Sequence, residues 1–190
     1  MNLFKNKTFV WLLCSIPSWF IIFQAFHAKK FWSKSIAISG YTAAALLAIS
    51  LVVAPLHKNF PSIRLFNFLN RRKREIGLSV FFYAVFHVFA FFVKENIKTG
   101  QLPWIYFLHP VIIPGLIALF IFLLLTLTSN DYSIKKMTHP KWKSLHRTVY
   151  LAEGCVFLHM VLQFGPVSIW GCIIFIPLFI IQRLRLQKQN

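Results

Sequence analysis

Acidic side chains are scarce in this chain. Its 190 residues include four Asp and Glu against 21 Lys and Arg, so no relay of acids and bases crosses the apolar segments as a transport path requires. The formal net charge of +17 would suggest nucleic acid in a soluble protein, but the basic residues stand in short segments between apolar runs. We therefore expect these residues to contact membrane lipid and set topology, with no nucleic-acid partner.

Cysteine and glycine are also limited. Cys14, Cys155 and Cys172 are isolated within apolar stretches and form no CxxC pair, which excludes a disulfide framework and a thiol-oxidase mechanism. The seven glycines include no GxGxxG loop, so flavin or nicotinamide must come on another polypeptide or not at all. The HxxxH clusters of di-iron membrane oxidases are absent as well.

Apolar residues dominate what is present. They make up 57% of the chain and predict an all-α membrane protein, a bundle of six transmembrane helices. The first run has no small-residue cleavage site, so we expect it to stay as a helix. No sequence repeat is detected, and we predict one domain over residues 1–190. The predicted helices are 9–26, 36–54, 76–93, 104–128, 145–164 and 167–182.

The basic residues predict the orientation. With a cytoplasmic N-terminus, sixteen of the 21 Lys and Arg fall on the cytoplasmic side and five on the other. Cytoplasmic loops of membrane proteins carry an excess of Lys and Arg. We therefore expect a multi-pass protein of the inner (cell) membrane with both termini in the cytoplasm.

Two histidines stand at matched depths in the third and fifth predicted helices, which both run outward. His87 lies eleven residues past Ile76, about 16 Å into the bilayer, and His159 lies fourteen past Leu145, about 21 Å in. An imidazole in hydrocarbon needs a partner, and inward histidines from two helices can hold haem iron. We predict that His87 and His159 hold one haem in the outer half of the bilayer. A hydrogen bond between helices is the competing interpretation for any single histidine.

His146 lies at the cytoplasmic rim of the fifth helix, thirteen residues before His159. We predict that it serves a second, inner haem. Thirteen residues at 100° each place these two histidines about 140° apart on an ideal helix, so a shared face needs unwinding near Gly154. The third helix has no histidine at its inner end, where Lys73 and Arg74 are candidates, and the opposite ligand stays unassigned.

Basic and aromatic residues near these histidines suggest supporting roles. The run 71–74 is first a topology and lipid-headgroup feature. Its second role places Arg74 opposite Arg147 as cationic partners for two haem propionates. The aromatic residues around His87 suit a haem-packing surface, namely Phe81, Phe82, Phe86 and Phe89.

Four residues of the fifth helix share one predicted stripe and should face the same neighbour, namely Trp142, His146, Tyr150 and Glu153. We interpret Trp142 as an anchor at the membrane interface. Glu153 is the one acid deep in a predicted span. It is either a group of a proton or quinone site, or a protonated carboxyl hydrogen-bonded across the bundle.

Two motifs resemble those of the ferric-reductase-like transmembrane family. The first contains a basic pair, Gly77-Leu78, an aromatic run and His87, and the second contains Trp142, Leu145-His146, Val149-Tyr150-Leu151 and His159. The chain is most similar to the haem-binding membrane subunits of bacterial methionine sulfoxide reductase systems. Relatives with a flavin-binding extension carry a histidine fourteen residues before the one that matches His87, where this chain has Lys73.

The resemblance implies one or two b-type haems bound by His87, His146 and His159. It implies that electrons pass from quinol or a cytosolic flavin reductase to a periplasmic molybdopterin-containing reductase, which repairs oxidised methionines. FMN or a quinone is the further cofactor that it allows on the cytoplasmic side. We therefore expect a redox subunit whose substrate chemistry occurs on its partner, and not a complete enzyme.

Two alternatives stay open. The first is direct reduction of ferric chelates or quinone at the membrane surface, which would make the chain an oxidoreductase in its own right. The second belongs to another class: a haem-free structural or transport protein that uses its histidines to join helices.

Overall fold

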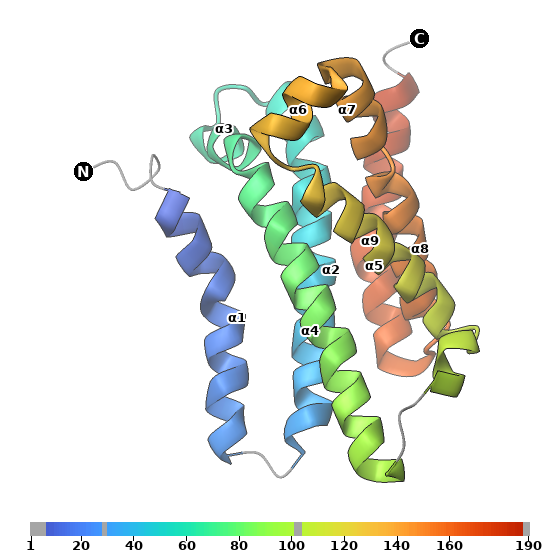
Figure 1. Cartoon of the computed structure of the whole chain (residues 1–190). Coiled ribbons are helices and arrows are strands. Elements are labelled where there is room, and N and C mark those ends of the chain that lie inside the picture. The colour runs from blue at the N-terminus through green and yellow to red at the C-terminus, as the bar shows by residue number, and fades with distance from the viewer. Residues whose placement is uncertain (1–6, 28–29, 101–103, 188–190) are drawn as a thin grey trace. The chain divides into compact units, whose positions relative to one another are not determined.

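The computed structural model describes residues 7–27, 30–100 and 104–187, and every regular element in these ranges is helical (Figure 1). The predicted all-α fold is confirmed. A helix suits these apolar stretches because it satisfies its backbone polar groups internally. The elements are α1 (Lys7–His27), α2 (Phe31–Asn59), α3 (Arg64–Arg71), α4 (Lys73–Thr99), the 3₁₀ helix η2 (Trp104–Leu108), α5 (Ile112–Leu127), α6 (Asp131–Met137), α7 (His139–His146), α8 (Val149–Val161) and α9 (Gly165–Gln187).

The helices form two compact units. The first unit contains α1 to α4 and the part of α9 from Ile174, and the second contains η2, α5 to α8 and α9 up to Ile173. The single domain over residues 1–190 stays a prediction. The orientation also stays a prediction. Three of the basic residues counted for it lie outside the described residues, namely Lys5, Lys29 and Lys188.

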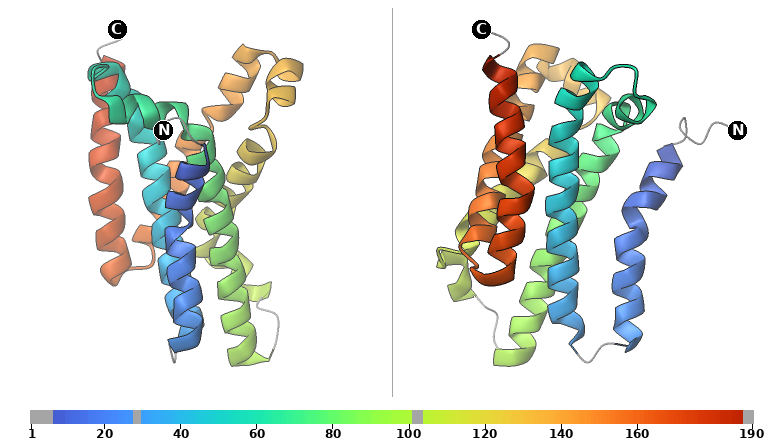
Figure 2. Two further views of the ribbon diagram at one scale, coloured as in Figure 1. Left: turned by 90° about the vertical axis from the view of Figure 1, so that its left-hand side faces the viewer. Right: turned by 180° about the vertical axis from the view of Figure 1, so that it is seen from behind.

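In the first unit, α2 and α4 run antiparallel and pack along most of their length (Figure 2). The buried residues of α2 include several small ones, Ser35, Ser39 and Ala44. The Ser39 hydroxyl donates to the Ser35 carbonyl at 2.6 Å, so its polarity is satisfied within the helix. Small residues let helix backbones approach each other closely in a membrane. Backbone atoms of α2 therefore come within reach of α4 side chains.

Helix α1 is joined to α4 by one tyrosine. The Tyr83 hydroxyl donates to the Cys14 carbonyl at 2.6 Å and accepts from the Ser18 backbone N–H at 3.1 Å. Cys14 and Ser18 would be direct partners in an ideal helix, and Pro17, which has no N–H, lies between them. The hydroxyl thus satisfies the α1 backbone at its proline.

The short helix α3 has an apolar face and a basic face. Phe68 is buried in a small core with Val10 and Ile76, whereas Arg64 and Arg71 are exposed. The alternation follows the helical period, so α3 covers the end of the first unit with its apolar side. Its basic side faces solvent or lipid headgroups.

In the second unit, α5 packs against α8, and α6 and α7 form a hairpin between them in the chain. The Asn130 side chain caps α6 by accepting the Ser133 N–H at 2.7 Å. Thr138, with φ 65°, then separates α6 from α7. The hairpin carries exposed cations, and we call them the basic α6–α7 surface: Lys135, Lys136, Lys141, Lys143 and Arg147.

The chain is a multi-pass membrane protein. Within the described residues, α1, α2, α4 and α9 are long and apolar enough to cross a bilayer, and a fifth span is obtained if α5 and α6, bent by 90°, count as one. These four helices correspond to the predicted segments 9–26, 36–54, 76–93 and 167–182.

The other two predicted segments contain breaks. In 104–128, η2 and α5 are separated by a turn in which the Val111 N–H donates to His109 Nδ1 at 3.3 Å. In 145–164, a turn at Arg147 and Thr148 leaves α8 with 13 residues. Both helices are therefore shorter than predicted. Pro110, which lacks an N–H, explains the first break.

The link through Tyr83 can be tested by Tyr83→Phe. Removing the hydroxyl leaves the Cys14 carbonyl and the Ser18 N–H without their shared partner, at a cost of about 1–2 kcal/mol. We expect the thermal midpoint of the detergent-solubilised protein to fall by a few degrees. Tyr41→Phe on α2 is the control, because this hydroxyl makes no hydrogen bond within the described residues. Equal midpoints for both variants would contradict the link.

Candidate functional site

His87 lies midway along α4 and is half-buried. Its Nδ1 is 2.9 Å from the backbone carbonyl of Ile36 on α2. A carbonyl oxygen only accepts hydrogen bonds, so Nδ1 carries the proton and Nε2 carries the lone pair of the neutral ring. This tautomer, with one nitrogen bonded to a backbone carbonyl, is the usual state of a metal-ligating histidine.

His159 near the end of α8 repeats this arrangement. Its Nδ1 is 2.6 Å from the Val111 carbonyl, which precedes α5. The side-chain amide of Gln163 lies 3.0 Å from Nε2 and donates to it, as expected for a nitrogen with a lone pair. Both histidines therefore have the tautomer of an axial ligand that binds iron through Nε2. In His159, the exposed Gln163 amide occupies the position where a ligated iron would be.

His146 at the end of α7 has the opposite tautomer. The Thr128 hydroxyl donates its one proton to the Leu124 carbonyl at 2.8 Å, so it accepts from His146 Nε2 at 3.1 Å. The lone pair therefore lies on Nδ1. His146 lies on α7, outside the candidate spans. Burial lowers the pKa of its imidazole from the usual value, which favours the neutral ring.

His146 and His159 belong to separate sites within the second unit. They contact α5 at Thr128 and just before its start at Val111, seventeen residues apart. At 1.5 Å per residue this is about 25 Å, so one iron cannot bind both. His87 belongs to the first unit, so its pairing with His159 stays a prediction.

Trp142 is held between two imidazoles. Its ring stacks on His146 at 4.0 Å and on the exposed His139 at 5.9 Å. Its indole N–H donates to the Thr128 carbonyl at 2.9 Å, which attaches α7 to the end of α5. Trp142 thus has a packing partner and a hydrogen bond inside the unit, beyond the interface role predicted from the sequence.

The turn at Arg147 and Thr148 divides the predicted stripe of the fifth helix, which leaves Trp142 and His146 on α7 and Tyr150 and Glu153 on α8. Tyr150 is 45% exposed, whereas Glu153 is 0% exposed. The two residues therefore have different surroundings, although both lie on α8 and only three residues apart. Glu153 is a buried residue of α8, and a buried carboxyl group needs a proton or a partner.

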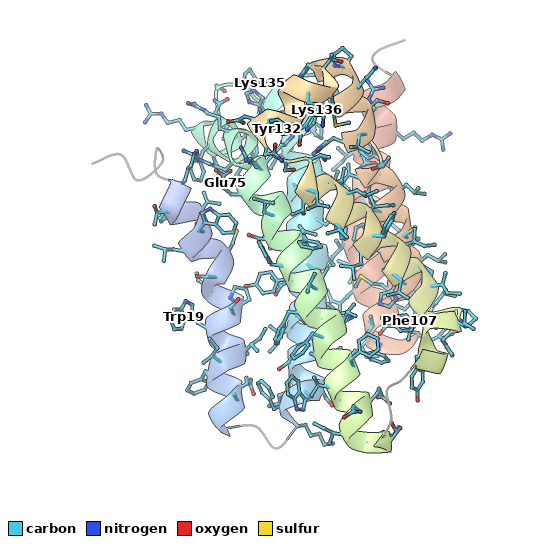
Figure 3. All side chains as sticks on the ribbon, viewed as in Figure 1. Trp19, Glu75, Phe107, Tyr132, Lys135 and Lys136 are labelled. Atoms are coloured by element: carbon cyan, nitrogen blue, oxygen red, sulfur yellow. The ribbon has the colours of Figure 1, made fainter. Side chains whose placement is uncertain are left out.

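The predicted propionate partners Arg74 and Arg147 are both exposed, the first on α4 and the second just after α7. Arg72, beside Arg74, lies 3.5 Å from the carboxylate of Glu75, which is buried at the start of α4 (Figure 3). The propionate role of Arg74 and Arg147 stays a prediction.

The first unit also contains an apolar cavity of about 370 Å³ between α1 and α4. Phe82 and Phe86, predicted as haem-packing residues, line it with Tyr83 and Trp11. The hydroxyl of Tyr83 already bonds to α1, so the cavity presents mainly aromatic and aliphatic atoms. Sequence patterns did not single out Tyr83, because a tyrosine in a Phe-rich run carries no distinct periodicity.

A bare metal ion finds no obvious cage, since no three His, Cys, Asp or Glu side chains gather within the described ranges. Haem needs only one imidazole on each side of its iron. His87 and His159, taken singly, each have an Nε2 lone pair of the kind that such a ligand uses. The Ile36 and Val111 carbonyls orient these rings. Every residue has a backbone carbonyl, so the sequence could not identify these two.

Comparison with known families agrees with these features. The family described as "Ferric reductase like transmembrane component" matches residues 39–156. The matched range includes His87 and His146 and ends three residues before His159. Because it covers more than half of the chain, the chain belongs to the ferric-reductase-like transmembrane family.

Curated relatives give a finer comparison. The magnetosome proteins MamZ of Magnetospirillum gryphiswaldense and Paramagnetospirillum magneticum are 36% and 34% identical over 124 residues, 65% of this chain and 18% and 19% of the relatives. The protein-methionine-sulfoxide reductase heme-binding subunit MsrQ of Brucella ovis is 30% identical over 125 residues, 65% of this chain and 54% of the relative. The chain thus spans about half the length of MsrQ and about a fifth of MamZ. The resemblance drawn from the two motifs, to the ferric-reductase-like family and to MsrQ, is confirmed.

The hydrogen bond of the Trp142 indole can be tested by Trp142→Phe. This change removes the N–H donor to the Thr128 carbonyl, at a cost of about 1–2 kcal/mol. Amide hydrogen exchange across α6 and α7 should therefore rise by about 5–30-fold. Trp19→Phe is the control, because Trp19 projects outward from α1 and is 67% exposed (Figure 3). Unchanged exchange in the Trp142 variant would show that the indole hydrogen bond does not hold α7.

Proposed function

We propose that this chain is a membrane redox subunit that binds b-type haem and transfers electrons across the bilayer. The observation that carries the proposal is the matched state of His87 and His159, each with Nδ1 bonded to a backbone carbonyl. The MsrQ relatives, named as heme-binding subunits, support it. A hydrogen bond used only to join helices would not require the same tautomer in both rings.

His87 and His159 would be the axial ligands of one haem, and His146 would serve a second. Haem, when bound, supplies a one-electron iron couple, and two axial imidazoles suit electron transfer because no position is left for a substrate. Arg74 and Arg147, exposed and permanently charged, would pair with propionates. His146 would have to exchange its Thr128 hydrogen bond to present Nε2.

Electrons would enter at the cytoplasmic side, where the basic residues of the chain concentrate. The basic α6–α7 surface surrounds the stack of His139, Trp142 and His146, which runs from an exposed ring to a candidate ligand. Lys135 and Lys136 project from α6 beside it (Figure 3). This charge suits an acidic donor protein such as a cytosolic flavin reductase, with FMN as its carrier. Quinol in the membrane is the alternative electron donor.

The proposed acceptor is a periplasmic reductase of methionine sulfoxide with a molybdopterin cofactor. The name of the MsrQ relatives supports an assembly with a methionine sulfoxide reductase. We place the chain in the bacterial inner membrane with both termini in the cytoplasm, following the excess of Lys and Arg on that side. The substrate chemistry would take place on the partner.

A second candidate function is direct reduction of a ferric chelate or quinone. The family description names ferric reductases, and the similar MamZ proteins belong to magnetosomes. Both findings support direct reduction as the second candidate. The two functions differ in whether the chain alone turns over an acceptor.

Single histidine variants test the haem assignment. We expect His87→Ala and His159→Ala each to abolish the outer haem, because one imidazole is lost from its iron, whereas His146→Ala spares it. The measurement is a reduced-minus-oxidised spectrum with haem quantitation per chain. His57→Ala, near the end of α2 and outside these hydrogen bonds, is the control. Complete haem loss in all three ligand variants would refute the assignment, and a colourless wild-type protein would favour the haem-free alternative.

Ferric citrate distinguishes the two redox functions. We expect the purified, reduced chain to show little steady-state reduction of ferric citrate without a periplasmic partner, because both axial positions of its outer haem are occupied. Turnover should appear only when the partner reductase and its methionine sulfoxide substrate are added. Substantial partner-free turnover would favour the second function instead.

A further inference from the structure

A glycine stands against the ring of His87. Gly40 lies on α2, one helical turn after Ile36, whose carbonyl accepts from His87 Nδ1. A Cβ atom added to Gly40 would be 2.9 Å from His87 Nδ1 and 3.0 Å from its Cε1. Real Cβ atoms essentially never approach a ring this closely, so the imidazole sits where only a glycine leaves room.

A second glycine stands in the same way against His159. Gly115 lies on α5, four residues after Val111, whose carbonyl accepts from His159 Nδ1. A Cβ on Gly115 would be 3.0 Å from Nδ1 and 3.2 Å from Cε1. The acceptor carbonyl, the glycine four residues later and the histidine of the packed helix therefore recur with the same spacing.

The surrounding elements recur in the same order. In the first unit, α2 carries the carbonyl and the glycine, the short basic helix α3 follows, and α4 carries the histidine. In the second unit, α5 takes the first role, α6 and α7 with their exposed lysines follow, and α8 carries the histidine. The sequence shows no detectable repeat, but the structure contains the same arrangement once in each unit.

We propose that the chain contains two copies of one ligand-holding device, in which Gly40 and Gly115 are positioning residues for His87 and His159. We call each glycine with its acceptor carbonyl an imidazole seat. The inference rests on the proposed function, because the seats matter when the rings bind iron. Each seat fixes the ring plane between the glycine and the carbonyl and keeps the proton on Nδ1.

The seat acts on the iron through the hydrogen bond. Donation from Nδ1–H to a carbonyl makes the ring a more basic ligand, and loss of such a partner costs about 10–100-fold in metal affinity. A methyl group at Gly40 would meet the ring at 2.9 Å and one at Gly115 would meet it at 3.0 Å, so each ring would have to shift away from its glycine, which strains its hydrogen bond to the carbonyl. A less basic ligand favours ferric iron less, so the midpoint potential should rise.

The chain provides matched controls on the histidine helices themselves. Gly77 on α4 and Gly154 on α8 have no atom within 4 Å of an added Cβ. Both are helical, so alanine there removes backbone freedom without a clash and should leave stability unchanged or slightly higher. The four Gly→Ala variants thus separate loss of the seat from the general effect of replacing a membrane-helix glycine.

The experiment is haem titration and redox titration of the purified full-length variants. We expect Gly40→Ala and Gly115→Ala to lower haem affinity by about 10–100-fold and to raise the midpoint potential. Gly77→Ala and Gly154→Ala should match the wild type in both measurements. Seat variants that match the wild type would overturn the inference, and so would control variants that lose haem equally.

Imidazole rescue gives a second measurement that does not depend on straining the ring. In His87→Gly, added imidazole should enter the space left by the side chain and restore haem binding. Adding Gly40→Ala should weaken this rescue by about tenfold or more, whereas adding Gly77→Ala should not. Rescue that is indifferent to residue 40 would contradict the seat.

The outcomes distinguish failure of the seats from failure of the proposed function. A wild-type chain that takes up no haem contradicts the proposed function, and the seats with it. A wild type that binds haem while its seat variants behave like the controls contradicts the seats alone. Haem loss confined to the seat variants supports both.

Discussion

The hydrogen bond from an imidazole Nδ1 to a backbone carbonyl of the packed helix is the interaction on which the site depends. In hydrocarbon an unpartnered imidazole is costly, and this bond satisfies one ring nitrogen while it directs the lone pair to the other. His87 and His159 both make it, at 2.9 and 2.6 Å. Without it, neither ring would have a defined plane or tautomer, and an iron could not be held in a fixed geometry.

The helix pairing serves this contact. A side chain on one helix reaches a backbone carbonyl of another only where the two backbones approach closely, which needs small residues. Buried Ser35, Ser39 and Ala44 on α2 provide such a surface beside the seat at Gly40. In the second unit, His159 bonds to Val111 just before α5. At the opposite end of α5, the Thr128 hydroxyl bonds to His146 and the Thr128 carbonyl accepts from the Trp142 indole. The two ends therefore differ in chemistry as well as in position.

Much of this could be predicted from the sequence. Apolar length predicted the helices, and the motifs around His87 and His159 predicted the family and the residues to examine. The break at Arg147 and Thr148 was missed, because a short turn does not change the hydropathy of the segment that contains it. The carbonyls of Ile36 and Val111 could not be found, since any residue supplies one. The two glycines were visible, but nothing in the sequence states which histidine they contact.

The central proposal is that His87 and His159 would be the two axial ligands of one haem. Electron paramagnetic resonance of the oxidised, purified wild-type protein tests it most directly, because the spin state reports how many strong axial ligands the iron has. The account predicts a low-spin ferric signal typical of two imidazoles. A high-spin, five-coordinate signal, or no haem signal after expression with ample haem, would contradict it.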